Sequence, residues 1–279
     1  MRRAGFLKAA VAVTGFTAFF AASVCLAATP LTISFVDVGH GNATLFYQPG
    51  SCAMLVDAGP AEQGENLREL LEKYKIKTLD YMVVTSPAPE YYFGLNIILS
   101  DVTIKELSDN GDPGRDGFDE YRQLQERIPY SVVAAGDSWQ CGDVKVNVLN
   151  PPVEIAESPD RRSRSLALMI SFGRFRMLMM NDLAGRGERE LLARDHDLQA
   201  MVLTIGNHGA ADGTSSQLLA RVRPRMAVAS VGRDRRLLLP AESVVSRIKG
   251  ANIHLYTTRQ SGTISLKVQP DGSARLARQ

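Results

Sequence analysis

The sequence has little net charge for its length. Its 279 residues include 32 Lys and Arg against 30 Asp and Glu, which gives a formal charge of +2. A chain so nearly neutral does not attract polyanions by its overall field, so any site for anions must come from a local cluster of basic residues. The length suits one large domain or two small domains with full hydrophobic cores.

Long hydrophobic runs are missing except at the N-terminus. There, three basic residues precede an apolar run that begins at Ala9, and residues 25–27 offer a small-residue cleavage site. We interpret 1–27 as the signal peptide of an exported bacterial protein, periplasmic or extracellular, which uses the Sec or the twin-arginine route. If the segment stayed uncleaved, it would be the one membrane contact that we expect. Its removal would change the formal charge to −1.

Cysteine is scarce as well. Of three cysteines, Cys25 lies in the signal, which leaves Cys52 and Cys141. Both lie in turn-rich strand segments, and an oxidising compartment would permit a disulfide between them. Two free thiols are an equal alternative, because sequence alone does not place the two side chains together.

Strand patterns alternate with helical ones along the remaining chain. The segments 31–39, 43–50 and 52–59 are rich in β-formers, are separated by turns, and predict a three-strand meander. An amphipathic helix follows at 67–74, and 78–86 returns to a strand. Helices are also expected from Pro89, over 118–128, and around Leu191, Leu218 and Val244. Further strands are expected at 144–152, 165–173, 175–182, 200–207, 225–232, 252–258 and 262–272.

The two halves share this organisation. Each predicts an antiparallel sheet with some crossover helices, and no low-complexity linker separates them. We therefore expect one domain over 28–279, an α+β sandwich of two mixed sheets flanked by helices, in four layers of the order αββα.

Several motifs carry a family resemblance. They are "FVDVGHGNATLF", "MLVDAG", "SLALMISFGRFRMLMMND", "LTIGNHGAADGTSSQLLARVRPRMAVASVG" and "SGTISLKV". Together they resemble the metallo-β-lactamase fold, in the branch found at the C-terminus of DNA-uptake competence channel proteins of the ComEC type. The resemblance covers about residues 31–272, and it implies a hydrolase fold whose metal site lies at strand ends. It also implies that Asp57, at the end of the third strand, braces neighbouring loops by hydrogen bonds.

The metal-binding motif of that family is degenerate here. The family's His-x-His-x-Asp-His motif falls on Ser86, Ala88, Glu90 and Tyr91, so none of its three histidines is present. Zinc in such hydrolases needs imidazoles and carboxylates, with one position left open for an activated water. Alanine has no donor atom, and hydroxyls that keep their protons are poor zinc ligands. Two-metal catalysis is therefore not expected.

Downstream the motif is kept in part. Asp182 stands at the position of the family's bridging aspartate. In "GNHGA", Asn207 replaces the first histidine of a Gly-His-His-Gly-Ser signature and His208 keeps the second, while Leu239 replaces the histidine of a later Gly-His-Pro. We expect no metal cofactor. The alternative is a single Zn or Mn bound by Glu90, Asp182 and His208, or His208 acting as a general base.

Other residues could line a ligand groove at the former active site. The basic segments "RRSRS" and "GRDRR" border that groove in the resemblance, and guanidinium groups suit phosphate or carboxylate ligands. The aromatic residues after Pro89 could line the groove too, or could pack the helix onto the sheet. The groove candidates are His40, Tyr92, Arg161, Arg162, Arg164 and Arg233. His196, His254 and the arginines of "RVRPR" (221, 223 and 225) are expected to be ordinary surface or strand residues.

Three function classes follow. The first is a catalytically degenerate protein that binds an anionic or polymeric ligand, such as a nucleic acid, or a partner, through the old groove. The second is a metal-dependent hydrolase of phosphoester or related bonds with a reduced mononuclear site. The third is a structural partner in an envelope assembly.

Overall fold

The computed structural model describes residues 29–86, 88–112, 119–153, 160–233 and 238–277. The predicted signal peptide therefore lies outside the described residues, as do Arg235 and Arg236 of "GRDRR".

The first sheet begins with the predicted meander. Strands β1, β2 and β3 pair antiparallel, with Ile33 opposite Phe46 and Leu45 opposite Leu55. Parallel strands then extend the sheet, and β16 closes its other side by pairing with β1. Its order is β17 (Ala274–Leu276), β16 (Ile264–Val268), β1 (Leu31–Phe35), β2 (Ala43–Gln48), β3 (Cys52–Ala58), β5 (Tyr81–Val83), β7 (Leu107–Asp109) and β8 (Tyr130–Val132).

The second sheet repeats this plan. Strands β9 to β12 pair antiparallel, and β12 to β15 pair parallel. Its order is β15 (His254–Thr257), β14 (Met226–Ala229), β13 (Val202–Thr204), β12 (Phe175–Met179), β11 (Ala167–Phe172), β10 (Val144–Asn150) and β9 (Ser138–Cys141). Short strands β4 (Thr78–Leu79) and β6 (Thr103–Ile104) form a separate pair.

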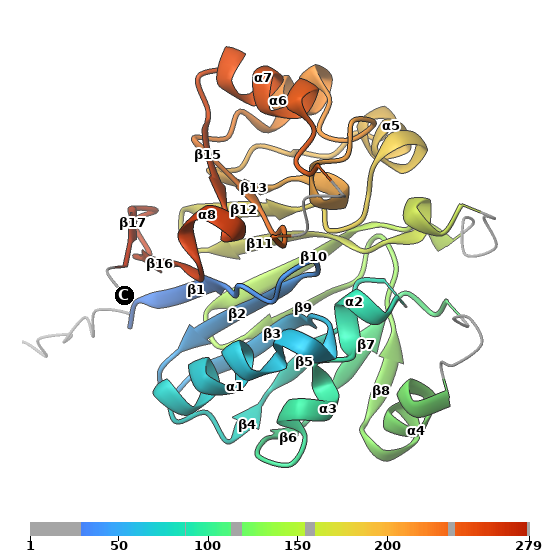
Figure 1. Ribbon diagram of the computed structural model, residues 1–279, viewed down its shortest axis with the longest axis vertical. Coiled ribbons are helices and arrows are strands. Elements are labelled where there is room, and N and C mark those ends of the chain that lie inside the picture. The colour runs from blue at the N-terminus through green and yellow to red at the C-terminus, as the bar shows by residue number, and fades with distance from the viewer. Residues whose placement is uncertain (1–28, 87, 113–118, 154–159, 234–237, 278–279) are drawn as a thin grey trace, which may run out of the picture.

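Helices cover the outer face of each sheet (Figure 1). On the first sheet lie α1 (Gly64–Lys73), α3 (Leu95–Ile98) and α4 (Asp119–Arg127); on the second lie α5 (Gly185–Ala193), α6 (Ser216–Val222) and α7 (Glu242–Gly250). The shorter elements are α2 (Pro89–Tyr92), α8 (Thr258–Ser261), and the 3-10 turns η1 (Ala61–Gln63), η3 (Arg161–Arg164) and η4 (Gly206–Gly209).

Three hydrophobic cores hold these layers together. The central core lies between the sheets and takes alternate residues of the strands, such as Ile33 and Phe35 from β1 and Met177 from β12. One outer core holds Leu67 and its neighbours on α1, and the other holds the apolar faces of α5, α6 and α7. Alternation buries one side of each strand and the helical stripes bury the other. The predicted four-layer sandwich is confirmed.

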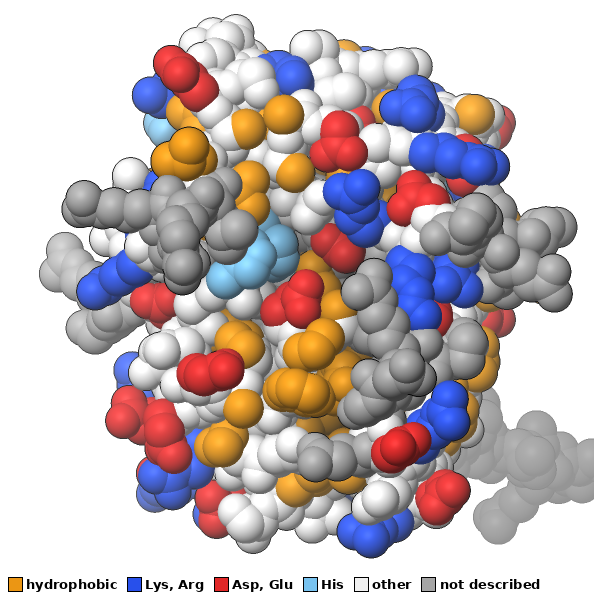
Figure 2. Space-filling model, turned by 45° about the vertical axis from the view of Figure 1, so that its right-hand side comes forward, with side chains coloured by type: hydrophobic (Ala, Val, Ile, Leu, Met, Phe, Trp, Pro, Cys, Tyr) orange, Lys and Arg blue, Asp and Glu red, His pale blue; other side chains and the backbone are white. Residues whose placement is uncertain are grey.

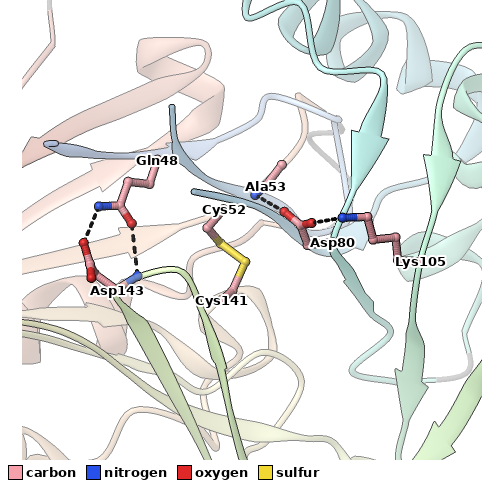
Figure 3. The surroundings of a disulfide bond; sticks show 7 residues. All are labelled: Gln48, Cys52, Ala53, Asp80, Lys105, Cys141 and Asp143. Atoms are coloured by element: carbon pink, nitrogen blue, oxygen red, sulfur yellow. Dashed lines mark hydrogen bonds and ion pairs between the residues drawn. A yellow bond between two sulfur atoms is a disulfide. The ribbon is translucent and has the colours of Figure 1, made fainter. Parts of the chain in front are cut away.

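A disulfide joins the two sheets (Figure 3). Cys52 starts β3 and Cys141 ends β9, with Cα atoms 5.2 Å apart. Beside it, Gln48 donates from Nε2 to the Asp143 carboxylate at 2.7 Å and accepts from the Asp143 backbone N–H at 3.1 Å. Of the two alternatives for these cysteines, the structure has the disulfide.

Within the residues that the structure describes, no helix combines the length and the apolar character needed to cross a bilayer.

Candidate functional site

The candidate site lies where strand ends of both sheets meet. Loops that follow β1, β12, β13 and β14, together with the short helix α2, supply its side chains. The backbone is unusual at this edge, because Asp57, Asn181, Asn207 and His208 all have a positive φ between 46° and 58°. Non-glycine residues adopt this conformation at a cost, so such a cluster marks a place where side-chain direction is closely determined.

His208 is held in one tautomer by its surroundings. It sits in η4, is 3% exposed, and its Nδ1 lies 2.8 Å from the backbone oxygen of Ser230. A carbonyl oxygen only accepts, so Nδ1 carries the hydrogen. Burial lowers the pKa of His208, with the Ser230 hydrogen bond acting in the opposite direction. The other ring nitrogen, Nε2, then remains as an acceptor in the neutral ring.

Tyr91 occupies that acceptor. Its hydroxyl lies 3.1 Å from Nε2 of His208, and the residue is 1% exposed. The same hydroxyl hydrogen-bonds the Asp182 carboxylate. One phenolic hydrogen cannot serve two acceptors at once, so the trio lacks one proton when Asp182 is ionised and His208 is neutral. Burial and the nearby carboxylates raise the pKa of Tyr91, which keeps the hydroxyl protonated.

Protonation of Asp182 supplies the missing hydrogen, because a protonated Asp182 can donate to the Tyr91 hydroxyl while Tyr91 donates to Nε2 of His208. Burial raises the pKa of Asp182 to about 6; the hydrogen bond from Tyr91 opposes this, Glu90 adds to it, and Arg162 and His40 oppose it. The amide of Asn207 bridges the carboxylate and Arg162 when its nitrogen faces Asp182 (3.1 Å) and its oxygen faces Arg162 (3.0 Å). The site is therefore a cluster of polar side chains joined by hydrogen bonds.

These donors do not fit the family's two-metal centre. Ala88 has no donor atom, Ser86 is 4% exposed, and the Tyr91 hydroxyl keeps its proton and engages His208. Glu90 is near enough to affect the pKa of Asp182 and His208. Even so, the described part of the chain contains no group of three or more His, Cys, Asp or Glu side chains placed to hold a metal ion.

Two of the predicted groove arginines lie in an internal ion pair. Arg164 approaches the Asp112 carboxylate to 2.5 Å and Arg161 approaches it to 3.6 Å, and the Asp112 side chain is 0% exposed. A buried carboxylate needs counter-charges, so η3 turns these two guanidinium groups inward. Arg162, whose side chain is 52% exposed, and the exposed Arg233 remain accessible. The sequence shows no signal for Asp112 as their partner, since it stands in a polar loop without periodicity.

Tyr92 and His40 take different places. Tyr92 does not line the groove but is 4% exposed in the outer core of the first sheet, where its ring lies 4.8 Å from those of Phe93 and Tyr121. His40 does reach the site, with its ring 4.3 Å from that of His208. Its loop is tightly packed, because a Cβ at Gly232 would lie 2.7 Å from the His40 backbone nitrogen.

The charge at this edge is mixed. Figure 2 shows histidine side chains beside acidic ones, with a hydrophobic patch next to them and basic side chains farther off. Glu90 and Asp182 offset Arg162 and His40 at the site itself. His196 and His254 lie apart from it, on the loop after α5 and on β15.

Asp57 braces the site from beneath, as expected from the sequence. It is 0% exposed and accepts hydrogen bonds from the backbone N–H and the hydroxyl of Thr85, both at 2.7 Å. These bonds fix the start of the loop that carries Ser86 and Ala88.

Asp57 should make stability depend on pH. Burial raises the pKa of Asp57 well above its ordinary value. Because the folded-state pKa exceeds the unfolded-state pKa of about 4, stability is full below that pH and falls as the pH rises through the folded-state pKa. In Asp57→Asn, which tolerates positive φ and keeps an acceptor for Thr85, this fall should vanish. Urea unfolding at several pH values should then show that the free energy of unfolding of the variant rises relative to that of the wild type as the pH approaches neutral.

Asp57→Ala is the matched control for that experiment. It leaves the buried Thr85 N–H without a partner, so it should be about 1–3 kcal/mol less stable than Asp57→Asn at every pH. If the difference in free energy of unfolding between Asp57→Asn and the wild type stayed constant with pH, the prediction would be wrong.

The sandwich and the strand-end site define a protein of the metallo-β-lactamase fold. No protein-family model matches the chain. A solved metallo-β-lactamase fold protein, YhfI from Bacillus subtilis, superimposes with a TM-score of 0.54 at 11% identity, over 83% of this chain and 98% of that one.

One sequence relative carries a competence name: Competence protein ComA of Neisseria gonorrhoeae is 30% identical, over 47% of this chain and 19% of that protein. ComE operon protein 3 of Bacillus subtilis (strain 168) is 25% identical, over 84% of this chain and 33% of that protein. Recombination protein 2 of Haemophilus influenzae is 26% identical, over 86% of this chain and 29% of that protein. The chain thus spans about a third of the length of these last two relatives. The resemblance to the ComEC-type metallo-β-lactamase fold is confirmed.

Proposed function

We propose that the chain is an exported, catalytically degenerate metallo-β-lactamase-fold protein that serves DNA uptake by binding rather than by hydrolysis. The name of one relative, Competence protein ComA, supports the competence role. The disulfide supports a place in an oxidising compartment outside the cytosol.

One observation carries the loss of hydrolysis. The Tyr91 hydroxyl occupies the Nε2 nitrogen of His208, which is the nitrogen left free for ligation once Nδ1 binds Ser230. Metal binding would need that hydrogen bond to break and the buried tyrosine to move. No other imidazole than that of His40 lies next to the cluster within the described residues.

The groove then serves as a recognition surface. Its mixed charge, from Glu90, Asp182, Arg162 and His40, suits a polypeptide partner of the uptake apparatus or a small zwitterionic ligand better than a bare polyanion. The internal pairing of Arg161 and Arg164 with Asp112 supports this reading.

A metal-dependent hydrolase is the second candidate. The observation in its favour is that Glu90, Asp182 and His208 lie near enough to perturb one another, which a single Zn or Mn could exploit.

Metal analysis separates the two candidates. The purified mature protein, dialysed against Zn²⁺ or Mn²⁺ and then against buffer, should retain only trace metal, and neither ion should raise its Tm. A phosphodiester substrate should not be hydrolysed above the blank. Stoichiometric metal that disappears in Asp182→Ala, but not in the surface control Asp195→Ala, would establish the hydrolase instead.

A further inference from the structure

An arginine-lined groove lies at the end of the second sheet opposite the candidate site, where β12, β13 and β14 begin. Its middle part is a cavity of 290 Å³ lined by Arg174, Arg176, Arg223 and Arg225. It shares Arg223 with a cavity of 540 Å³ between α6 and α7, and Arg225 with one of 430 Å³ beside β17. The three neighbouring cavities follow one another from α6 and α7 at the top of Figure 1 toward β17 at the left, and we call them together the groove.

The lining of this groove has one sign of charge. Five arginines and one histidine face it, and no Asp or Glu lines any of the three cavities: the six are Arg174, Arg176, Arg223, Arg225, Arg247 and His254. The chain as a whole is close to neutral. A concave surface with low-dielectric walls focuses such a local field, which a scattered set of surface arginines does not.

The parallel strands fix the order of these residues. Met201 donates its backbone N–H to Arg176, Arg225 donates to Met201, and His254 donates to Arg225, at 2.9, 2.9 and 3.2 Å. Arg176, Met201, Arg225 and His254 thus form one row across the starts of neighbouring strands. Adjacent strands lie about 4.8 Å apart, so Arg176 and Arg225, with the strand of Met201 between them, start about 10 Å apart.

Some of these arginines bind other groups of the protein, and others are exposed to solvent and could bind a ligand. Arg247 donates to the backbone oxygens of Gly213 and Thr214, and Arg176 pairs with Asp197. Hydrogen bonds from Ser273 lower the pKa of Asp271, and the positive charge of Arg174 lowers it further. Among the described residues, no side-chain hydrogen bond or ion pair engages Arg225, and both Arg174 and Arg225 are exposed.

The cavity beside β17 is lined mainly by apolar and aromatic side chains rather than by arginines. Its lining includes Met201, Met226, Tyr256 and Leu266, and it adjoins the arginines at Arg225. Single-stranded nucleic acid is bound in other proteins by this combination, with phosphates on a positive groove and bases against aromatic and apolar side chains. A flat anionic bilayer would not enter a concave groove in this way.

We propose that this groove binds single-stranded nucleic acid, with its phosphates at Arg174 and Arg225 and a base in the cavity beside Tyr256. The site lies at the opposite ends of the strands from the degenerate metal site. The proposal goes beyond the proposed function and stands whether or not the old site binds metal.

The test is a matched comparison of two double variants in the full mature chain. Arg174→Ala/Arg225→Ala removes two charges from the groove, and Arg127→Ala/Arg189→Ala removes two exposed charges from α4 and α5. Binding of a fluorescent oligothymidylate of about 16 nucleotides is measured by anisotropy over a range of salt concentrations. The groove variant should bind about tenfold more weakly at low salt, with a salt dependence reduced by about one unit of slope. The control variant should bind like the wild type.

Other results would overturn the proposal. They are absence of binding at low salt, equal weakening in both double variants, or binding to phosphatidylglycerol vesicles in place of the oligonucleotide. A duplex of the same length that bound more tightly than the single strand would also count against it. Circular dichroism and Tm verify that each variant folds. None of these outcomes bears on the metal analysis of the old site.

Discussion

Removing the disulfide by Cys52→Ala/Cys141→Ala is expected to lower the free energy of unfolding by about 2–5 kcal/mol. The bond spans 89 residues of sequence and ties the first sheet to the second. A closed loop of that length restricts the unfolded chain strongly, and the chain-entropy treatment gives about 4.5 kcal/mol for it. The native state loses little packing in exchange, because alanine fills most of the space of each cysteine.

Urea unfolding of the wild type and the variant, each with and without reductant, measures this effect. The two cysteines are 3% and 2% exposed, so reduction of the folded protein should be slow and the reductant should act mainly during unfolding. Reduced wild type should then approach the variant, whereas reductant should leave the variant unchanged. An unfolding midpoint of the wild type that ignored reductant would show that the bond contributes nothing to stability.

The same bond shows where sequence reasoning stopped. The β-forming residues of segments such as 31–39 and stripes such as the leucines of α1 predicted the layers, because both are local patterns of the sequence. Whether Cys52 meets Cys141 depends on how two sheets face each other, which local pattern does not determine. Short strands such as β8 and β17 were missed for a similar reason, since three exposed residues carry no pattern.

The candidate site, too, could be predicted from the sequence only in part. Resemblance placed Tyr91, Asp182 and His208 at strand ends that the structure does bring together. It did not reveal that the Tyr91 hydroxyl binds His208, nor that Asp112 holds Arg161 and Arg164. Tyr92 shows the limit most simply, because neighbouring aromatic residues on a short helix point to different places, one to the site and the other to the core.

Restoring the lost imidazoles is expected to restore metal binding. In Ser86→His/Ala88→His/Tyr91→His, the substitution at Tyr91 frees Nε2 of His208, and three imidazoles join Asp182 near it. Three or four such donors hold Zn²⁺ with apparent free energies on the order of 10 kcal/mol when the chain fixes their geometry. The triple variant should therefore retain stoichiometric zinc after dialysis, and zinc should raise its Tm through linkage. Elemental analysis and thermal unfolding with and without Zn²⁺ measure both effects.

Tyr91→Phe is the matched control, because it removes the hydroxyl that binds His208 without adding a ligand. It should stay metal-free, since one freed imidazole and one carboxylate are too few for a tight site. Adding Asp182→Ala to the triple variant should weaken zinc binding at least tenfold, which ties the metal to this edge rather than to the new histidines alone. If the triple variant folded by circular dichroism but stayed metal-free, the backbone here would have moved away from a metal-binding geometry, and ligand loss alone would not explain the degenerate site. If Tyr91→Phe bound zinc by itself, the tyrosine would be a plug over a site that Glu90, Asp182 and His208 can still form, and the hydrolase would become the better account of the protein.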